Sequence, residues 1–168
     1  MKKSLLILTF VLSLFVAGVF ILYILLGQGH LLPAFFIGLG ISVADKGKIR
    51  QLPNYLCSII AGLVWSFFYT LINQFLIIIG IPPSVSMFIG MFVFVFLAIS
   101  LHLVVLDKTL LNSVPLVFAA ITAQFLFPDT QQYIGVFISL TLGVLVAVLS
   151  GPIAGLLEKG HKQKIESP

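Results

Sequence analysis

The chain has 168 residues, of which 60% are hydrophobic and 8% are charged, and its formal net charge is +4 at pH 7. Soluble domains are about 45–50% apolar and about 25% charged, so this composition excludes an ordinary soluble protein. The basic residues lie in short segments between long apolar runs rather than in one basic patch, which argues against nucleic-acid binding.

Six apolar runs separated by turns predict an all-α integral membrane protein with six transmembrane helices in a single domain, residues 1–168. The predicted helices cover residues 4–26, 33–44, 54–79, 83–106, 111–127 and 133–157, and residues 158–168 form a cytoplasmic tail. The first run follows Lys2 and Lys3, as in a signal peptide, but its length favours an uncleaved helix. A cleaved signal is the alternative, with Ala17-Gly18 as the processing site.

The second and fifth helices are short, and each is also compatible with a re-entrant helix. About fourteen residues cover about 21 Å, less than the roughly 30 Å hydrocarbon core. The positive-inside rule favours six full crossings with both termini in the cytoplasm, because all the Lys and Arg residues then fall on one side. These are Lys2, Lys3, Lys46, Lys48, Arg50, Lys108, Lys159, Lys162 and Lys164.

The two halves of the chain, about residues 4–80 and 83–157, align at an offset of 81–82 residues. Pro33-Ala-Phe-Phe36 matches Pro115-Leu-Val-Phe118, and Ser58-Ile-Ile-Ala-Gly62 matches Ser139-Leu-Thr-Leu-Gly143. Because each half has three crossings, the second copy is predicted to be inverted. Inverted 3+3 repeats are frequent in transporters and channels, and chance similarity between apolar stretches is the alternative.

Small and polar residues recur at every fourth position of the third and sixth helices, and therefore share one helix face. Small residues on such a face allow close helix packing in lipid. The candidates for packing are Gly62, Gly143, Ala147, Gly151 and Gly155. Polar residues of the spans are candidates for lining a solute path, with a purely structural role as the alternative; they are Ser42, Ser66, Thr70, Gln74, His102, Thr122 and Gln124.

No Asp, Glu, Lys or Arg lies inside a predicted span, which argues against a proton-driven pump. His102 is the one ionisable candidate: it either senses pH or contacts a solute, or it is a neutral histidine at the edge of the bundle. Gln124 must face protein or water, because an unpaired amide in hydrocarbon is costly.

The sequence contains no constellation typical of an enzyme. No Cys/His cluster, phosphate-binding loop or nucleophile elbow is present, so we expect no catalysis, cofactor or metal. The single cysteine, Cys57, excludes an internal disulfide. The four tyrosines fall near span ends or in the outer half of the spans, where anchoring at the membrane interface is the default; they are Tyr23, Tyr55, Tyr69 and Tyr133.

The stretch Ser58-Ile-Ile-Ala-Gly62-Leu-Val-Trp65, with Ser113-Val-Pro115 and the glycine-rich sixth run, resembles domain-of-unknown-function family 1097. This resemblance implies a small protein of the bacterial cytoplasmic (inner) membrane and brings no catalytic residues with it. The helix pattern is also similar to the repeat of fusaric-acid-resistance-type exporters, which have soluble regions that this chain lacks.

These observations favour a passive channel or transporter for a small, largely uncharged solute, embedded in the lipid bilayer. The alternative is a non-transporting membrane scaffold or interaction subunit, which needs only the small-residue faces and the basic tail. We expect homo-oligomers, because a bundle of 168 residues offers a thin wall around any pore.

Overall fold

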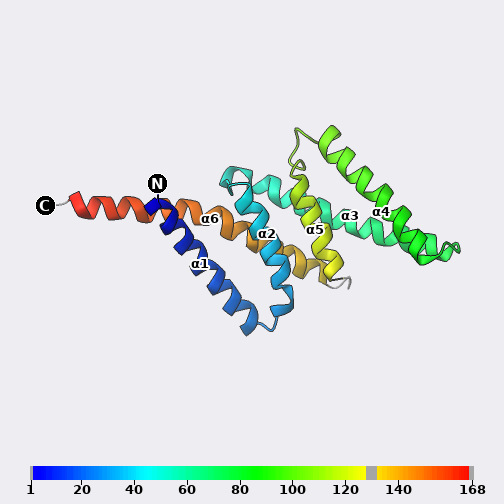
Figure 1. The fold of residues 1–168 in the computed structure, drawn as a ribbon, viewed down its shortest axis with the longest axis horizontal. Coiled ribbons are helices and arrows are strands. Elements are labelled where there is room, and N and C mark those ends of the chain that lie inside the picture. Colours follow the sequence, from blue (N-terminus) through cyan, green and yellow to red (C-terminus); the bar gives the residue numbers. More distant parts are fainter. Residues whose placement is uncertain (1, 128–131, 167–168) are drawn as a thin grey trace. The chain divides into compact units, whose positions relative to one another are not determined.

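The computed structural model describes residues 2–127 and 132–166, with side chains described for residues 6–127 and 132–157. This described part is helical and contains no β-strand (Figure 1). Its α-helices are α1 (Lys2–Leu25), α2 (Leu32–Ala44), α3 (Leu52–Ile78), α4 (Pro83–Ser100), α5 (Val114–Leu126) and α6 (Tyr133–Glu166). Short 3-10 turns, Gly29–Leu31 and Ile49–Gln51, precede α2 and α3, and a π-helix, Leu101–Val105, follows α4.

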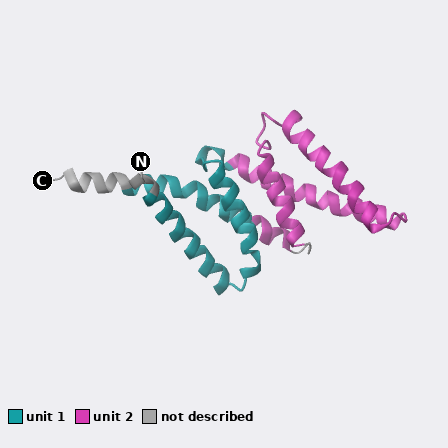
Figure 2. Ribbon diagram, viewed as in Figure 1, with its two compact units in different colours: residues 1–52, 138–168 teal, residues 53–137 magenta. Residues whose placement is uncertain are grey.

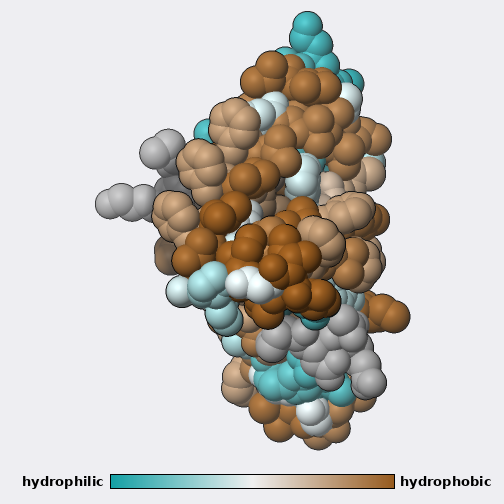
Figure 3. Space-filling model, turned by 90° about the vertical axis from the view of Figure 1, so that its right-hand side faces the viewer, coloured by the Kyte–Doolittle hydropathy of each residue, from teal (hydrophilic) through white to brown (hydrophobic). Residues whose placement is uncertain are grey.

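Among the described residues, four helical segments are long and apolar enough to cross a membrane by length and composition. They are Leu6–Leu25, Ile49–Ile78, Pro83–Val105 and Tyr133–Leu157. In the view of Figure 3, hydrophobic residues cover most of the described surface, as expected of helices that face hydrocarbon. The predicted class, an all-helical protein with helices suited to a membrane, is confirmed.

The helices α2 and α5 are indeed short. Each has 13 residues, or about 20 Å at a rise of 1.5 Å per residue. Prolines fix where they start: Pro33 and Pro115 lie in the first two positions, where a missing N–H breaks no intrahelical bond. The fifth helix was predicted from residue 111 but begins at Val114, because Pro115 sets its first turn.

Two further boundaries differ from the prediction. The fourth helix was predicted to run unbroken to residue 106, yet its α-helical part ends at Ser100 and the π-helix replaces the last turn. The sixth helix was predicted to end at residue 157, but the helix continues to Glu166. Residues 158–166 are rich in Glu, Lys and Gln, which are strong helix formers outside the membrane as well as near it.

The chain forms two compact units, each with its own buried residues (Figure 2). Unit 1 contains residues 1–52 and 138–168, which are α1, α2 and most of α6. Unit 2 contains residues 53–137, which are α3, α4, α5 and the first turn of α6. Each unit therefore combines two helices from one half of the sequence with the third helix of the other half.

Each unit has its own packed interior. In unit 1, Phe35 of α2 and Leu140 of α6 are fully buried, and the Tyr23 hydroxyl of α1 donates a 2.7 Å hydrogen bond to Ser139 of α6. In unit 2, a cluster of buried side chains joins α3, α4 and α5; its members are Tyr69, Phe94, Val117 and Ile121.

Candidate functional site in the two short helices

Helix α5 packs so closely on α3 that no side chain fits between them at Gly62. A Cβ atom built on Gly62 would lie 2.7 Å from the Cβ atom of Ala120 and would also overlap the carbonyl oxygen of Val117. Real Cβ atoms do not approach this closely, so glycine is required for this crossing. Small residues at such a contact are the usual way for helix backbones to approach each other in lipid.

Helix α2 packs on α6 in the same way within unit 1. A Cβ atom built on Gly143 would lie 2.6 Å from the backbone nitrogen of Leu39 and would overlap the carbonyl oxygen of Phe35. A Cβ atom on Gly38 would lie 3.0 Å from the carbonyl carbon of Leu140. Both partners of this crossing thus depend on glycine.

The two crossings use residues that correspond in the sequence. Gly62 and Gly143 are 81 residues apart, and the carbonyls that they face, Val117 and Phe35, are 82 residues apart. The offset is the one at which the two halves of the sequence align. The same pair of contacts is therefore made once inside unit 1 and once inside unit 2.

Each short helix carries one buried polar side chain near its C-terminal end. Ser42 of α2 is 0% exposed and Gln124 of α5 is 3% exposed, and these two positions are again 82 residues apart. The Ser42 Oγ and Gln124 Oε1 atoms have no hydrogen-bond partner among the described residues. The Gln124 amide nitrogen is satisfied, since it donates a 2.6 Å bond to the Phe127 carbonyl. Burying a polar oxygen without a hydrogen-bond partner lowers the stability of the fold by about 1–3 kcal/mol. A bound water or solute that donates a hydrogen bond to such an oxygen would remove this cost.

The other candidate residues for a solute path are scattered. Ser66 is buried and its hydroxyl lies 3.3 Å from the Tyr133 hydroxyl, while the Thr70 hydroxyl bonds back to the Ser66 carbonyl at 3.1 Å. Gln74 and Thr122 lie on the exposed surface of unit 2. Within this unit, Ser66 and Gln124 are thus interior, and Gln74 and Thr122 are not.

Some of the candidate packing residues make close helix contacts and others do not. Gly62 and Gly143 make the two close crossings. Ala147 is buried, and its carbonyl oxygen lies 3.0 Å from a Cβ atom built on Gly47. Gly151 and Gly155 have open space beside them within the described residues.

Sequence reasoning missed the partners of the tyrosines and of His102. All four tyrosines are at least half-buried, and the hydroxyls of Tyr23 and Tyr133 lie beside the hydroxyls of Ser139 and Ser66. The anchoring of the tyrosines at a membrane interface stays a prediction. The His102 ring meets Trp65 and the Leu111 carbonyl. A buried tyrosine hydroxyl usually has a hydrogen-bond partner, so the serines of the other helices were the sequence signal that could have indicated these contacts.

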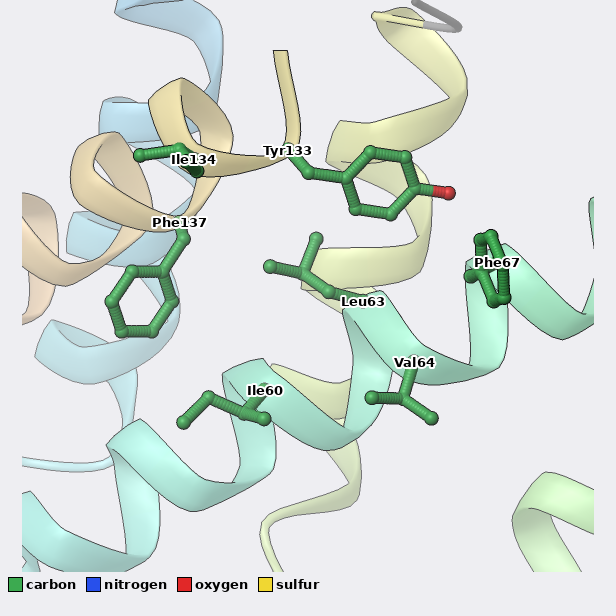
Figure 4. Close-up of a pocket in the computed structure, with 7 residues that line it drawn as sticks. All are labelled: Ile60, Leu63, Val64, Phe67, Tyr133, Ile134 and Phe137. Carbon is green, nitrogen blue, oxygen red and sulfur yellow. The ribbon is translucent and has the colours of Figure 1, made fainter. Parts of the chain in front are cut away.

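A shallow groove runs along α3 where the first turn of α6 lies against it (Figure 4). Its volume is about 490 Å³, and its lining is apolar apart from the Tyr133 hydroxyl. In Figure 4 the Tyr133 ring extends toward Phe67. Among the described residues that line it, no second polar side chain is present to orient a polar solute.

The described residues contain no group of three or more His, Cys, Asp or Glu side chains that could hold a metal ion. Cys57 is half-buried on α3.

No family model, no curated protein and no solved structure matches this chain. The resemblance to domain-of-unknown-function family 1097 therefore stays a prediction.

Proposed function

We propose that this protein is a passive membrane channel or transporter for a small, largely uncharged solute. The observation that carries the proposal is the pair of short helices, each held to a long helix through glycine and each burying one polar side chain with an unpartnered oxygen. Ser42 and Gln124 offer such a solute hydrogen-bonding groups that the protein itself leaves unused. Solute sites formed by short or broken helices are typical of inverted-repeat transporters.

The proposed architecture is a 3+3 inverted repeat that crosses the membrane six times, with helices α2 and α5 as its short members. The matching contacts of Gly62 and Gly143 support a repeat, because chance similarity between apolar stretches would not reproduce the same backbone contact. The basic residues support six crossings, since they then lie on one side of the membrane. In this arrangement both termini are cytoplasmic.

The resemblance to family 1097 supports a place in the bacterial cytoplasmic membrane. Homo-oligomers fit the small size of the chain. An uncharged solute fits the two short helices, which contain no Asp, Glu, Lys, Arg or His. A buried charge would require a compensating partner that these helices do not supply.

The alternative, a scaffold without transport, is favoured by one exposed surface. Phe88, Phe92 and Phe96 form a row at every fourth residue of α4, and each is more than 60% exposed. Such a row is suited to packing against the helix of another membrane protein, as well as against lipid. Affinity purification after crosslinking distinguishes the two: a stoichiometric partner favours the scaffold.

Flux measurements test the proposal. The protein, reconstituted in liposomes, is assayed by stopped-flow light scattering with water, glycerol, urea and acetic acid, and we expect permeation above empty liposomes for at least one of them. Gln124→Leu removes the unpartnered oxygen and should lower this flux about two- to tenfold, which corresponds to one hydrogen bond of about 0.5–1.5 kcal/mol.

Thr122→Val is the matched control, because Thr122 lies on the same helix but on its exposed side. It should leave the flux unchanged. Permeation equal to that of empty liposomes for every solute would contradict the proposed function. If Gln124→Leu and Thr122→Val changed the flux equally, Gln124 would not contact the solute.

A further inference from the structure

The π-helix at the end of α4 turns one ionisable side chain into unit 2. Its i to i+5 bond joins the Leu106 nitrogen to the Leu101 carbonyl at 2.9 Å. His102 is 2% exposed, whereas its neighbour Val104 is 75% exposed. A π-helix inserts an extra residue into a helix and re-aims the side chains around it, and it is frequent at functional sites.

Both ring nitrogens of His102 have partners on other elements. The Trp65 indole Nε1–H of α3 donates to His102 Nε2 at 3.0 Å. His102 Nδ1 lies 2.5 Å from the carbonyl oxygen of Leu111, which belongs to the segment leading into α5. The imidazole thus links α3, the end of α4 and the approach to α5.

These partners permit only one protonation state. An indole nitrogen is a donor only and a carbonyl oxygen is an acceptor only. His102 Nε2 must therefore carry a lone pair, and Nδ1 must carry the proton. The ring is held as the neutral Nδ1–H tautomer.

A second proton would break the link at one defined point. If Nε2 takes a proton from solution, it loses its lone pair and points an N–H group at the N–H group of Trp65. The Leu111 contact is kept, because Nδ1–H remains a donor. Protonation therefore removes the hydrogen bond between α3 and the end of α4 and leaves the contact with the α5 segment intact.

The two direct partners of the His102 ring carry no charge. The partners on α3 and on the α5 approach, Trp65 and Leu111, do not ionise. On α3, Tyr69 belongs to the cluster against which Trp65 packs, and its ring packs against Phe94. The charged groups closest in the chain, Asp107 and Lys108, are exposed in the turn after the π-helix.

We propose that Trp65, His102 and Leu111 form a latch that acid releases. The latched state keeps His102 neutral, and the released state lets it take up a proton. Because the state that binds more protons is favoured as the pH falls, acidification favours release. Histidine is the residue suited to this change between about pH 5 and 8. The latch does not depend on the identity of the solute.

The single tryptophan makes the latch directly observable by NMR. Protein labelled with ¹⁵N at the indole nitrogen and at histidine, in nanodiscs, has one indole N–H resonance, from Trp65. At pH 8 we expect this resonance at a hydrogen-bonded shift and the His102 ring as the Nδ1–H tautomer. Between pH 8 and pH 5 the indole resonance should move upfield while the His102 ring becomes doubly protonated.

Two variants serve as controls. His102→Gln keeps an acceptor for Trp65 but cannot ionise in this range, so its indole resonance should not move with pH. His30→Gln removes an exposed histidine in the turn before α2. In this variant the Trp65 indole resonance should move with pH as it does in the wild type. An immobile wild-type indole resonance, or a transition that persists in His102→Gln, would overturn the proposal. An Nε2–H tautomer at pH 8 would overturn it from the wild type alone, whether or not the Gln variant folds.

Discussion

Two glycines determine how closely the short helices approach the long ones. At Gly62 and Gly143 the nearest facing atoms are the backbone carbonyl oxygens of Val117 and Phe35, and a backbone atom cannot turn aside as a flexible side chain would. A methyl group at either place would force the helices apart. Because packing gaps in lipid are not compensated by a hydrophobic effect between helices, this separation would be costly.

The pair Gly143 and Gly155 on α6 tests this claim within one helix. Gly143→Ala should lower the free energy of unfolding by about 1–3 kcal/mol, the usual cost of overpacking. Gly155→Ala meets open space and should leave it unchanged or raise it by up to about 1 kcal/mol, the helix propensity gained over glycine. Unfolding in mixed micelles, followed by circular dichroism, measures both. Equal losses in the two variants would contradict the crossing described for Gly143.

At the scale of the helices, the ends of α1, α2 and α3 follow one pattern. In α3, the Gly80 nitrogen bonds to the Ile77 carbonyl and the Ile81 nitrogen bonds to the Leu76 carbonyl, each at 3.0 Å. This is a Schellman ending, which needs a left-handed residue after the helix. Gly80 supplies it with φ of 91°. In α2 the same position is taken by Lys46, with φ of 60°, although a side chain is strained there.

Substitutions at these two ends should therefore have opposite signs. Lys46→Gly relieves the left-handed strain and should raise the free energy of unfolding by about 1 kcal/mol, whereas Gly80→Ala should lower it by about 1 kcal/mol. The same micelle unfolding assay measures both. A loss of stability in Lys46→Gly would mean that the lysine side chain contributes more than its backbone strain costs.

The number and type of the helices followed from the sequence because apolar runs, prolines and glycines act locally. Pro33 and Pro115 mark the starts of α2 and α5, and Gly27 and Gly80 mark the ends of α1 and α3. The π-helix carries no such mark, since Leu101–Val105 reads as an ordinary apolar helix. Within it, His102 contacts Trp65 and Leu111, which lie outside this segment.

The site was less accessible to sequence reasoning because its contacts are long-range. Trp65 and His102 are 37 residues apart, and Tyr23 and Ser139 are 116 residues apart. The repeat alignment did indicate that Gly62 and Gly143 correspond. It did not indicate that each faces the short helix of the other half, because that follows from packing and not from periodicity.

At the scale of the whole molecule, each unit contains two helices from one half of the sequence and the third helix of the other half. Unit 1 holds α6 from the second half of the sequence and unit 2 holds α3 from the first half. This distribution follows from the two close crossings, because the third helix of each half packs on the short helix of the other half. The proposed inverted repeat requires that the short helices cross the membrane, so that the basic segments before α3 and before α5 lie on the same side.

Cysteine accessibility in intact bacterial cells tests this topology most directly. Single cysteines are placed at exposed positions outside the six α-helices in a Cys57→Ser background, and none of them replaces a basic residue. They are Ile49 and Leu110 before α3 and α5, and Gln28 and Ile79 on the opposite side. A membrane-impermeant maleimide added outside should label the cysteines at 28 and 79 and should label those at 49 and 110 only after the cells are opened. Labelling of the cysteine at 49 in intact cells would mean that α2 turns back within the membrane, and it would contradict the six-crossing inverted repeat.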